Sequence, residues 1–464
     1  MCTMSEEPVR AILKRGRIFE VGGAVRDRYL SHGQVVKDRD YLVTGVTYDE
    51  LTSILRDYGR VDLVGRSFGV IKFTQQRKGK THTFDISLPR KEHSTGPGHT
   101  DFAVDFDPAI PVEQDLLRRD FTINAMALAL DNDELIDPLQ GLADLKNRRL
   151  RMTSPDSFPE DPLRMLRAIQ FAARFQFDIE PATFQALQQH AAFIASVSAE
   201  RISEELTKLL VHAERPSDGF RVMHTSTLLG HILPELEACV EVTQPGPYHK
   251  YDVFEHTIRT VDACPQSLRL RLAALFHDIR KPQARRLTET GATFYGHEIT
   301  GARAAVTAMN RLRYPRELAQ QVATLVERHM YTTPVTEKGL RRLIRRVGVD
   351  LIFELLDLRR ADVVAQGMGG STVDVDELEA AIREELSHKP PLGVGDLALD
   401  GRDIMALLGV DPGPVVGQVL DYLLEKVLDQ PQDNTREQLE TYAKEYHQTL
   451  TSGRLPDGGK DIDA

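Results

Sequence analysis

A glycine pair followed by two closely spaced aspartates constrains the fold of this chain more than any other feature. In residues 21–45, VGGAVRDRYLSHGQVVKDRDYLVTG, a short apolar strand ends at Gly22 and Gly23, and a helical segment follows. Asp38 and Asp40 lie on the next predicted strand, where alternate side chains point to the same face. Two neighbouring carboxylates repel each other, so the pair requires a counter-ion or a chemical role.

Residues 16–140 are predicted to form a mixed α/β unit. Strands are expected over 17–23 and 36–44, helices over 24–31 and 47–59, and a hairpin over 61–75 and 81–90. In its second strand Phe84, Ile86 and Leu88 share one face, so Asp85 lies on the other face and can point into a polar cleft. The segment 91–111 is rich in Gly, Pro, Ser and Thr and is predicted to be a long loop, which is often functional.

The apolar spacing becomes helical from about residue 115 and is predicted to stay helical to the end of the chain. A break at 244–252 marks a module boundary, 388–396 is a candidate linker, and the last residues form a disordered tail. We therefore predict four parts: 1–140, 141–243, 244–372 and 373–464.

Composition places the chain among globular cytoplasmic proteins. Its 464 residues carry a net charge of −11, and no apolar run is long enough to span a membrane. Three distant cysteines form neither a zinc pattern nor a disulfide framework, which fits a reducing compartment. This net negative charge argues against a surface that is basic throughout and binds polyanions over its whole area. Two arginine clusters, at 148–151 and 341–346, are either local nucleic-acid patches or solvated faces.

The first candidate site combines the glycine turn with the carboxylates. Gly22 and Gly23 let the backbone approach a ligand, and the helix that follows favours an anion, with Arg26 in reach of a phosphate. Asp38 and Asp40 offer the hard oxygen ligands that suit Mg²⁺, and Asp85 can supply a third carboxylate. Two such ions can activate an attacking hydroxyl and stabilise a leaving pyrophosphate.

This arrangement resembles the nucleotidyltransferases of the polymerase-beta superfamily and, more narrowly, the class II tRNA nucleotidyltransferases, or CCA-adding enzymes. Similar motifs continue at 116–127 (LLRRDFTINAMA), 137–151 (DPLQGLADLKNRRLR), 160–175 (EDPLRMLRAIQFAARF) and 400–420. The resemblance implies an α+β nucleotidyltransferase head, an all-α neck and body, an HD-type helical domain and a helical tail. It further implies that Asp38, Asp40 and Asp85 are metal ligands and that Gly22, Gly23 and Arg26 form a phosphate-binding turn. By the same resemblance, Arg119, Asp120 and Asn124 contact the sugar and triphosphate, and Asp161, Arg164 and Arg167 form the base template.

The expected reaction is attack of a tRNA 3′-hydroxyl on the α-phosphate of CTP or ATP. Asp161 and Arg164 are spaced i and i+3, so they are predicted to share a helix face. One carboxylate and one guanidinium can hydrogen-bond a base edge with an amine beside a ring nitrogen, which cytosine and adenine have and uracil and guanine lack. The tRNA acceptor stem is expected to be bound by shape. The alternative is that Arg164 and Arg167 only pair with acids across a helical neck.

The second candidate site is a set of histidines and aspartates, which are His256, His277, Asp278, His297, His329 and Asp362. An adjacent His-Asp pair between distant histidines resembles the HD-superfamily phosphohydrolases, and the ligand set suits a divalent transition metal. The resemblance implies a phosphatase or 2′,3′-cyclic phosphodiesterase, as in bifunctional bacterial CCA proteins. A metal-free module is the alternative, and Arg280 departs from the glycine usual at its position.

Three other functions remain open from the sequence. A poly(A) polymerase would share the head, although such enzymes usually have a more basic tail and no HD module. An enzyme that adds only CC or only A is the second alternative; the loop predicted at 91–111 favours full CCA addition, because the resemblance links such a loop to the switch to ATP. An inactive RNA-binding scaffold is the third, and the intact carboxylates argue against it. The oligomeric state is left open.

Overall fold

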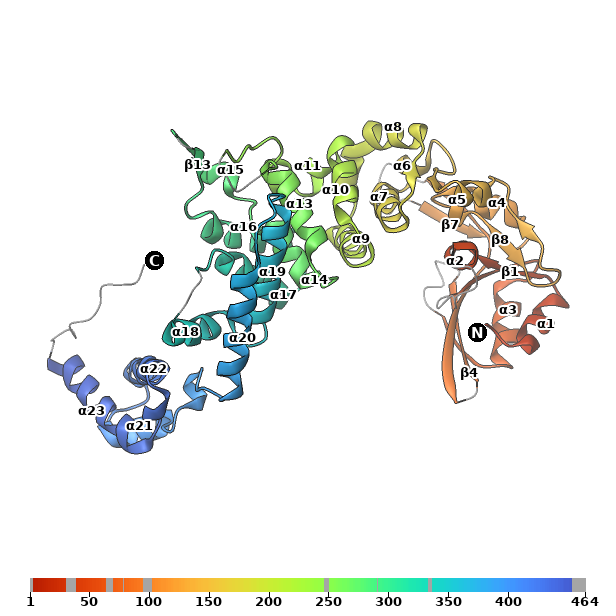
Figure 1. Ribbon diagram of the computed structural model, residues 1–464. Coiled ribbons are helices and arrows are strands. Elements are labelled where there is room, and N and C mark those ends of the chain that lie inside the picture. The colour runs from red at the N-terminus through yellow and green to blue at the C-terminus, as the bar shows by residue number, and fades with distance from the viewer. Residues whose placement is uncertain are drawn as a thin grey trace. The chain divides into compact units, whose positions relative to one another are not determined.

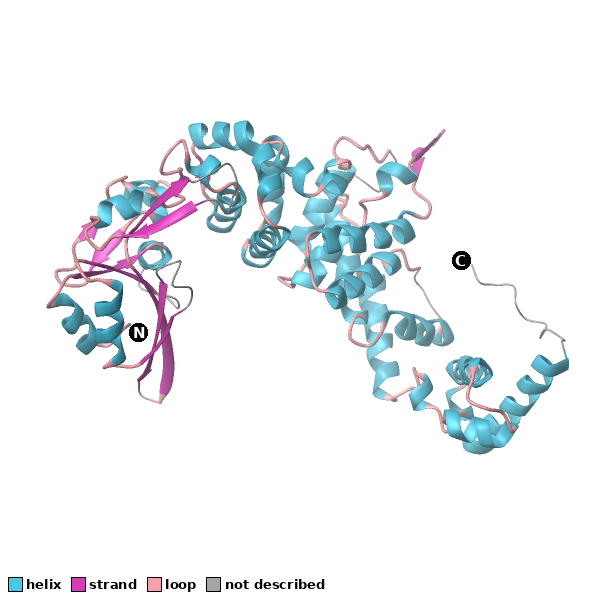
Figure 2. Cartoon of the chain, turned by 180° about the vertical axis from the view of Figure 1, so that it is seen from behind, coloured by secondary structure: helices cyan, strands magenta, loops and turns pink. Residues whose placement is uncertain are grey.

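The computed structural model describes residues 3–30, 39–63, 70–77, 79–94, 102–245, 250–289, 291–332 and 336–452. Asp38 and the tail predicted to be disordered lie outside these ranges. The chain forms two compact units: the first contains residues 1–240, 266–268 and 307–315, and the second contains the rest. Strands gather in the N-terminal part of the chain, and helices make up most of the remainder (Figure 2).

A seven-stranded sheet organises the start of the first unit (Figure 1). Its order is β3-β4-β5-β2-β1-β8-β9, from the strands β1 (Arg17–Val21), β2 (Asp40–Thr44), β3 (Arg60–Leu63), β4 (Val70–Arg77), β5 (Lys80–Ser87), β8 (Ala127–Ala129) and β9 (Leu135–Ile136). Strand β2 pairs with β1 in antiparallel and with β5 in parallel orientation. The centre of the sheet therefore carries the predicted aspartate strand between two neighbours.

Both faces of this sheet are covered by helices. On one face, α1 (Glu6–Leu13) and α3 (Tyr48–Arg56) pack against a core that includes Ile18, Phe73 and Ile86. Helix α3 begins at a capping box in which Thr47 and Glu50 satisfy each other's backbone donors. On the other face, Phe19 and Leu42 pack with α4 (Val112–Leu117). Asp85 lies opposite the buried Phe84, Ile86 and Leu88, as predicted.

The prediction of a loop over 91–111 is wrong in two stretches, at 91–94 and 102–106, whereas 107–111 is irregular as predicted. Residues Arg90–Ser94 form β6 and residues Phe102–Phe106 form β7, and the two pair as an antiparallel hairpin. The Gly and Pro residues that suggested a loop fall at 96–98, between the strands, while Phe102, Val104 and Phe106 alternate as strand residues do. Residues 95–101 lie outside the described ranges.

The prediction of continuous helix beyond residue 115 is also wrong. Strands β8 and β9 follow α4 and extend the head sheet at its β1 edge, through the pairs Phe19–Ala129 and Val21–Ala127. The residues of β8 are Ala-Leu-Ala, which have good helix propensity, so tertiary pairing overrides the local preference.

The remainder of the first unit is largely helical. Its elements are α2 (Gly23–Leu30), η1 (Thr122–Asn124), α5 (Gly141–Lys146), β10 (Arg149–Leu150), α6 (Ser157–Glu160), α7 (Leu163–Phe175), β11 (Asp178–Ile179), α8 (Pro181–His190), η2 (Ala191–Ser196), α9 (Ala199–His212), α10 (Pro216–Thr225), α11 (Leu228–Ile232) and α12 (Pro234–Glu237). Helix α7 packs against α9 and α10, where Gly219 leaves room for Ile169 and Leu209.

Helices also dominate from residue 250 onward. They are α13 (Val253–Ala263), α14 (Leu268–Phe276), α15 (Lys281–Ala284), α16 (His297–Arg311), α17 (Arg316–Arg328), α18 (Glu337–Val347), α19 (Ile352–Ala365), α20 (Val373–Ser387), α21 (Gly401–Leu408), α22 (Pro414–Asp429) and α23 (Arg436–Ser452), with a hairpin of β12 (Arg286–Thr288) and β13 (Gly291–Thr293). None of the helices described is long and apolar enough to cross a membrane.

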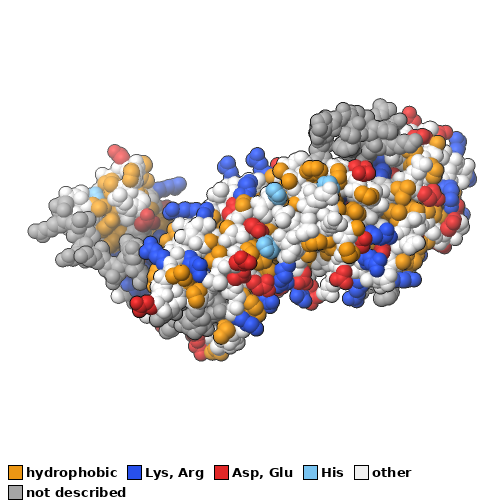
Figure 3. Space-filling model, turned by 90° about the horizontal axis from the view of Figure 1, so that it is seen from above, with side chains coloured by type: hydrophobic (Ala, Val, Ile, Leu, Met, Phe, Trp, Pro, Cys, Tyr) orange, Lys and Arg blue, Asp and Glu red, His pale blue; other side chains and the backbone are white. Residues whose placement is uncertain are grey.

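The arginine cluster at 341–346 is largely paired inside the protein. Arg341 bonds Glu385 and the carbonyl of Leu428, and Arg342 and Arg345 both contact Glu425. Basic and acidic side chains are also intermixed over the face shown in Figure 3. Of the two interpretations of this cluster, the ion pairs favour a helix face paired with neighbouring acids over a nucleic-acid patch.

Candidate functional site

A pocket of about 470 Å³ in the first unit brings together most of the residues predicted to bind a nucleotide. It is lined by Gly22, Gly23, Arg26, Asp40, Arg118, Arg119, Asp120, Asn124, Asp161, Leu163, Arg164, Arg167, Phe171 and Arg201. These residues come from the β1–α2 turn and the start of α2, the start of β2, the 118–124 segment, α7 with Asp161 just before it, and α9. Five separate stretches of the chain therefore contribute to one polar cavity.

Gly22, in the glycine turn at the edge of this pocket, has a backbone conformation that other residues rarely adopt. Gly22 has a φ of +68°, in the left-handed region that favours glycine. A Cβ at this position would lie 2.7 Å from Nη1 of Arg119. The turn and Arg119 thus fit against each other, which explains the glycine at this point.

The carboxylates lie on adjacent strands. Asp40 is the first residue of β2, and the parallel register pairs it with Asp85 on β5. Paired positions in neighbouring strands are about 5 Å apart and project to the same face. Asp40 lines the pocket, whereas Asp85 is one strand away and is not among the lining residues.

A buried chain of hydrogen bonds connects the residues at the back of the pocket. Asp120 Oδ2 accepts hydrogen bonds from Arg167 Nη2 and Nε, at 2.7 and 3.0 Å, and Oδ1 accepts one from Asn124 Nδ2 at 3.0 Å. Asn124 Oδ1 accepts a bond from Arg26 Nη1 at 2.7 Å. Burial alone would raise the pKa of Asp120, but Arg167 and Asn124 outweigh it and hold that pKa below its ordinary value. Asp120 therefore stays ionised, and it holds Arg167 directly and Arg26 through Asn124.

Arg26 also lies against two aromatic rings. Its guanidinium is 5.2 Å from the ring centre of Phe171 and 4.7 Å from that of Phe175, and burial lowers its pKa. Arg167 stacks on the same Phe171 ring. Two phenylalanine rings of α7 therefore hold the guanidinium of Arg26 in place.

The predicted base-template pair is in the pocket, but the predicted common helix face is wrong. Asp161 is extended, with φ −141°, and lies between α6 and α7, because the following Pro162 disfavours a helical conformation there. Its Oδ1 accepts from the backbone of Leu163 at 3.2 Å, and its Oδ2 pairs with Arg201 at 2.9 Å. Arg164 is in α7 and bonds the carbonyl of Arg118 at 2.9 Å.

Besides Leu163, three charged or aromatic pocket residues were not found from the sequence. Arg201 lies in the first turn of the amphipathic helix α9. No sequence motif relates it to Asp161, which is 40 residues earlier in the chain. Phe171 has the spacing of a core residue of α7. Arg118 adjoins the predicted Arg119, so it was the one residue of the three with a local signal.

The Asp120–Arg167 ion pair leads to a stability prediction. We expect Asp120→Asn to lower the free energy of unfolding of the first unit by about 2–4 kcal/mol, because Arg167 loses its buried carboxylate partner. This is below the full cost for an enclosed pair, since the Arg167 side chain is 33% exposed. Urea unfolding followed by hydrogen exchange of peptides from α7 measures the change. Asp131→Asn breaks the exposed pair with Arg17 and should cost less than about 1 kcal/mol; equal costs for both variants would contradict the prediction.

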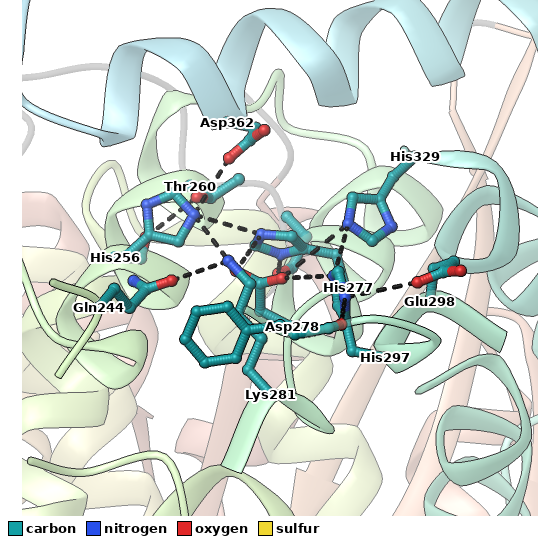
Figure 4. Close-up of polar contacts among 12 residues, drawn as sticks. Gln244, His256, Thr260, His277, Asp278, Lys281, His297, Glu298, His329 and Asp362 are labelled. Carbon is teal, nitrogen blue, oxygen red and sulfur yellow. Dashed lines mark hydrogen bonds and ion pairs between the residues drawn. The ribbon is translucent and has the colours of Figure 1, made fainter. Parts of the chain in front are cut away.

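The second candidate site lies in the second unit, where all six predicted histidines and aspartates converge (Figure 4). Asp278 is at the centre: Oδ2 lies 3.1 Å from His277 Nε2 and 3.5 Å from His256 Nε2, and Oδ1 lies 3.3 Å from His297 Nε2. His329 Nε2 is 3.9 Å from Oδ1. Two overlapping groups, His256–His277–Asp278 and Asp278–His297–His329, have the geometry of metal sites.

The backbone fixes the tautomer of three of these rings. Nδ1 of His277, His297 and His329 each lies 2.7 Å from the carbonyl oxygen three residues earlier in the chain. An Nδ1–H that donates to a carbonyl leaves Nε2 as a lone-pair donor for a metal. The Nε2 atoms then face each other at 3.3 Å in two pairs, His277 with His256 and His297 with His329. Imidazole nitrogens brought this close are suitable ligands for a shared cation.

Charge in this centre is balanced by neighbouring groups. Burial and the nearby His277 lower the pKa of His329 to about 3, so this imidazole is neutral at physiological pH. His256 Nε2 also lies 3.0 Å from Asp362. Lys281 Nζ is 2.7 Å from Asp278 Oδ2 and donates to Gln244 at 2.8 Å. Asp278 and the imidazoles around it would together hold a divalent ion, and the donor set of imidazole and carboxylate suits a transition metal.

A pocket of about 620 Å³ opens onto this centre. Five of the six metal-site residues line it, all except His256. The other lining residues are Gln244, Pro245, Lys281, Ala292, Thr293, Phe294, Tyr295, Gly296, Glu298, Met330, Arg359 and Gln366. Arg280, which departs from the usual glycine, is half-buried at the start of α15 and is not among the lining residues.

Family models match three stretches of the chain. Residues 18–151 match the poly A polymerase head domain, residues 176–240 match the RNA and SrmB-binding site of polymerase A, and residues 295–443 match tRNA nucleotidyltransferase domain 2. The first match covers the sheet and most of the pocket residues.

Curated relatives match over about two thirds or more of both chains. The A-adding tRNA nucleotidyltransferase of Deinococcus radiodurans is 37% identical over 69% of this chain and 76% of its own. The multifunctional CCA protein of Mannheimia succiniciproducens is 36% identical, covering 74% and 79%. The CC-adding tRNA nucleotidyltransferase of Thermus thermophilus is 38% identical, covering 68% and 73%.

Solved structures have the same fold. The Bacillus stearothermophilus CCA-adding enzyme in complex with CTP matches with a TM-score of 0.70 at 21% identity, over 96% of this chain and 97% of that one. The Thermotoga maritima CCA-adding enzyme complexed with tRNA matches with a TM-score of 0.54 at 21% identity, over 95% and 93%. At such identity the likeness establishes the architecture of a polymerase-beta-like head and a helical body.

Proposed function

The chain belongs to the tRNA nucleotidyltransferase family, and from this premise we propose that it adds the complete CCA sequence to tRNA 3′ ends from CTP and ATP. The observation that carries the proposal is the 470 Å³ pocket, which combines the Gly22–Gly23 turn, Asp40 and the pair Asp161 and Arg164. One end of this pocket suits a triphosphate and the other suits the edge of a base. We further propose that the protein acts in the cytoplasm.

The triphosphate is expected at the glycine turn. There the backbone of Gly22 and Gly23 and the side chain of Arg119 can approach phosphate oxygens closely. Mg²⁺, which the family generally uses, would be held by Asp38 and Asp40 with Asp85 in support, and would stabilise the charge on the phosphates. The 3′-oxygen of tRNA forms a bond to the α-phosphorus while the bond from that phosphorus to the pyrophosphate oxygen breaks, and the hydroxyl proton passes to a neighbouring carboxylate or water.

The base is expected between Asp161 and Arg164. The Asp161 carboxylate is oriented by Arg201 and by the backbone of Leu163, so it is set to accept a hydrogen bond from an exocyclic amine. Arg164 can donate to the adjacent ring nitrogen. This arrangement selects cytosine and adenine over uracil and guanine without a nucleic-acid template.

Full CCA addition is distinguished from the alternatives by the product. The curated relatives include A-adding, CC-adding and multifunctional CCA proteins at similar identity. We propose incubating the protein with tRNA that ends before CCA and supplying CTP alone, ATP alone or both. Two added residues with CTP and a third only when ATP is also present support full addition. Long A tails would identify a poly(A) polymerase, and a stop after CC or a need for preformed CC would identify a partial enzyme.

A second function is favoured by the histidine centre of the second unit. We propose that this centre holds a divalent transition metal and hydrolyses phosphate monoesters or 2′,3′-cyclic phosphates at tRNA 3′ ends. The support is the convergence of six buried or nearly buried ligands, three of them with the tautomer fixed by the backbone. Release of phosphate, or opening of the ring, from an end-labelled tRNA in the presence of Mn²⁺, Ni²⁺ or Co²⁺ tests it. A protein inactive in both assays would be the RNA-binding scaffold instead.

A further inference from the structure

The pocket at the histidine centre is larger than a phosphate requires. Its volume of about 620 Å³ is within the range of about 300–1,000 Å³ typical of pockets that hold an entire small molecule. The metal ligands occupy one part of its wall. The remaining wall includes Pro245, Phe294, Tyr295 and Met330, which have no role in metal binding. Those side chains must therefore face the portion of a substrate that carries no phosphate.

Two of these side chains are unusually exposed for their size. Tyr295 is 87% exposed and Met330 is 52% exposed, and both line the pocket. Tyr295 lies two residues after the end of β13 and two residues before the metal-site residue His297. A large aromatic side chain held in water beside a metal pocket is typical of a surface that a ligand covers.

Positive charge accompanies the apolar rim. Arg359 lines the same pocket and lies 3.0 Å from Asp362, and Lys281 lies beside Asp278, with its Nζ 5.3 Å from the Phe294 ring centre. Cations next to the metal ligands suit a phosphate, and the exposed ring suits a base attached to it. The lining thus has the two parts of a nucleotide at adjoining places.

We propose that Tyr295, assisted by Met330, is a stacking platform for the terminal base of a single-stranded RNA 3′ end, whose phosphate lies at the histidine centre. This inference rests on the proposed hydrolase activity of the second unit and names the residue that positions the substrate's terminal nucleotide. The exposure of Tyr295 fits a nucleotide that remains attached to a long chain, because a free small molecule would be enclosed on most sides. Stacking tolerates any base, so hydrolysis is expected to depend little on which base is terminal.

The chemical step is a hydrolysis. For a 2′,3′-cyclic phosphate, a water oxygen forms a bond to phosphorus while the bond from phosphorus to one ribose oxygen breaks. The departing ribose oxygen takes the proton that the water gives up. Tyr295 takes no part in this step; it places the terminal nucleotide.

The test compares two oligonucleotides that end in a 2′,3′-cyclic phosphate, one with its terminal base and one abasic. We expect wild-type protein to prefer the base-bearing end. Tyr295→Ala should lower this preference, measured as the ratio of kcat/KM values, by roughly 5- to 100-fold. Tyr295→Phe keeps a ring and should preserve the ratio. Leu287→Ala is the matched control, because Leu287 is 70% exposed on the neighbouring β12 but does not line the pocket.

Equilibrium binding separates this inference from the proposed hydrolase function. If wild-type protein binds the base-bearing end more tightly than the abasic end but hydrolyses neither, the result supports the stacking platform and contradicts the hydrolase function. Unchanged preference and unchanged binding in Tyr295→Ala would overturn the platform. Loss of the preference in Leu287→Ala as well would also overturn it, since the effect would then come from the hairpin as a whole.

Discussion

Substitution of Asp40 by Asn removes most of the nucleotide addition: we expect its rate to fall by at least about 1,000-fold. Asp40 is the described carboxylate that opens β2 and lines the nucleotide pocket, in register with Asp85. An amide keeps the size of the side chain but loses the charge that holds a hard cation. Addition of radiolabelled CMP to tRNA lacking CCA, followed on a gel, measures the loss.

The control for this prediction is Asp62→Asn. Asp62 is an exposed acid on β3, in the same sheet, and it pairs with Arg60 at 2.9 Å. Its loss should leave addition within about twofold, because exposed pairs contribute little. The hydrolase activity proposed for the second unit should be unchanged in Asp40→Asn. Nucleotide addition at the wild-type rate by that variant would refute the assigned role.

The second large effect is expected at Asp278. Asp278→Asn should reduce hydrolysis at tRNA 3′ ends by at least about 1,000-fold, because one carboxylate links both groups of imidazoles. The bound divalent metal should fall at the same time, as measured by elemental analysis of the purified protein. Chelation of wild-type protein should reproduce the loss of hydrolysis, and readdition of the metal should restore it.

Asp278 is buried beside Lys281, so its replacement can also weaken folding. Asp362→Asn is the companion variant, since Asp362 lies at the edge of the centre and contacts His256. Circular dichroism spectra like that of the wild type, with hydrolysis lost and nucleotide addition kept, would support the prediction. Full hydrolysis by both variants would show that the histidine centre is not the hydrolytic site.

Much of the architecture could be predicted from local patterns. Alternation placed Asp85 opposite a buried face, and the glycine turn between a strand and a helix is present at Gly22. The family resemblance drawn from motifs is confirmed by the family models and by the curated relatives. The adjacent His277 and Asp278 indicated a centre whose six members the structure brings together.

The remaining features depend on contacts between distant parts of the chain. Strand β8 has a helix-favouring sequence and is a strand because β1 presents an open edge. Composition suggested a loop at 91–111, since turn residues in the middle outweighed the short strands β6 and β7 at its ends. Arg201 reaches Asp161 only through the packing of α9 on α7, which no spacing records. Pro162 is a local signal for the extended conformation of Asp161, because a proline disfavours a helical conformation in the residue before it.

The histidine rings are oriented by carbonyls of their own helical turns and segments, at Ala274, Phe294 and Val326. Such a centre needs almost no reorganisation when an ion arrives, so strain provides little selection among ions of similar size. Which metal the centre would hold would then follow the metals available to it and the general affinity order of first-row metals. If the centre hydrolyses tRNA 3′ ends as proposed, the rate of that reaction would therefore change with the metal supplied, at a constant amount of this protein.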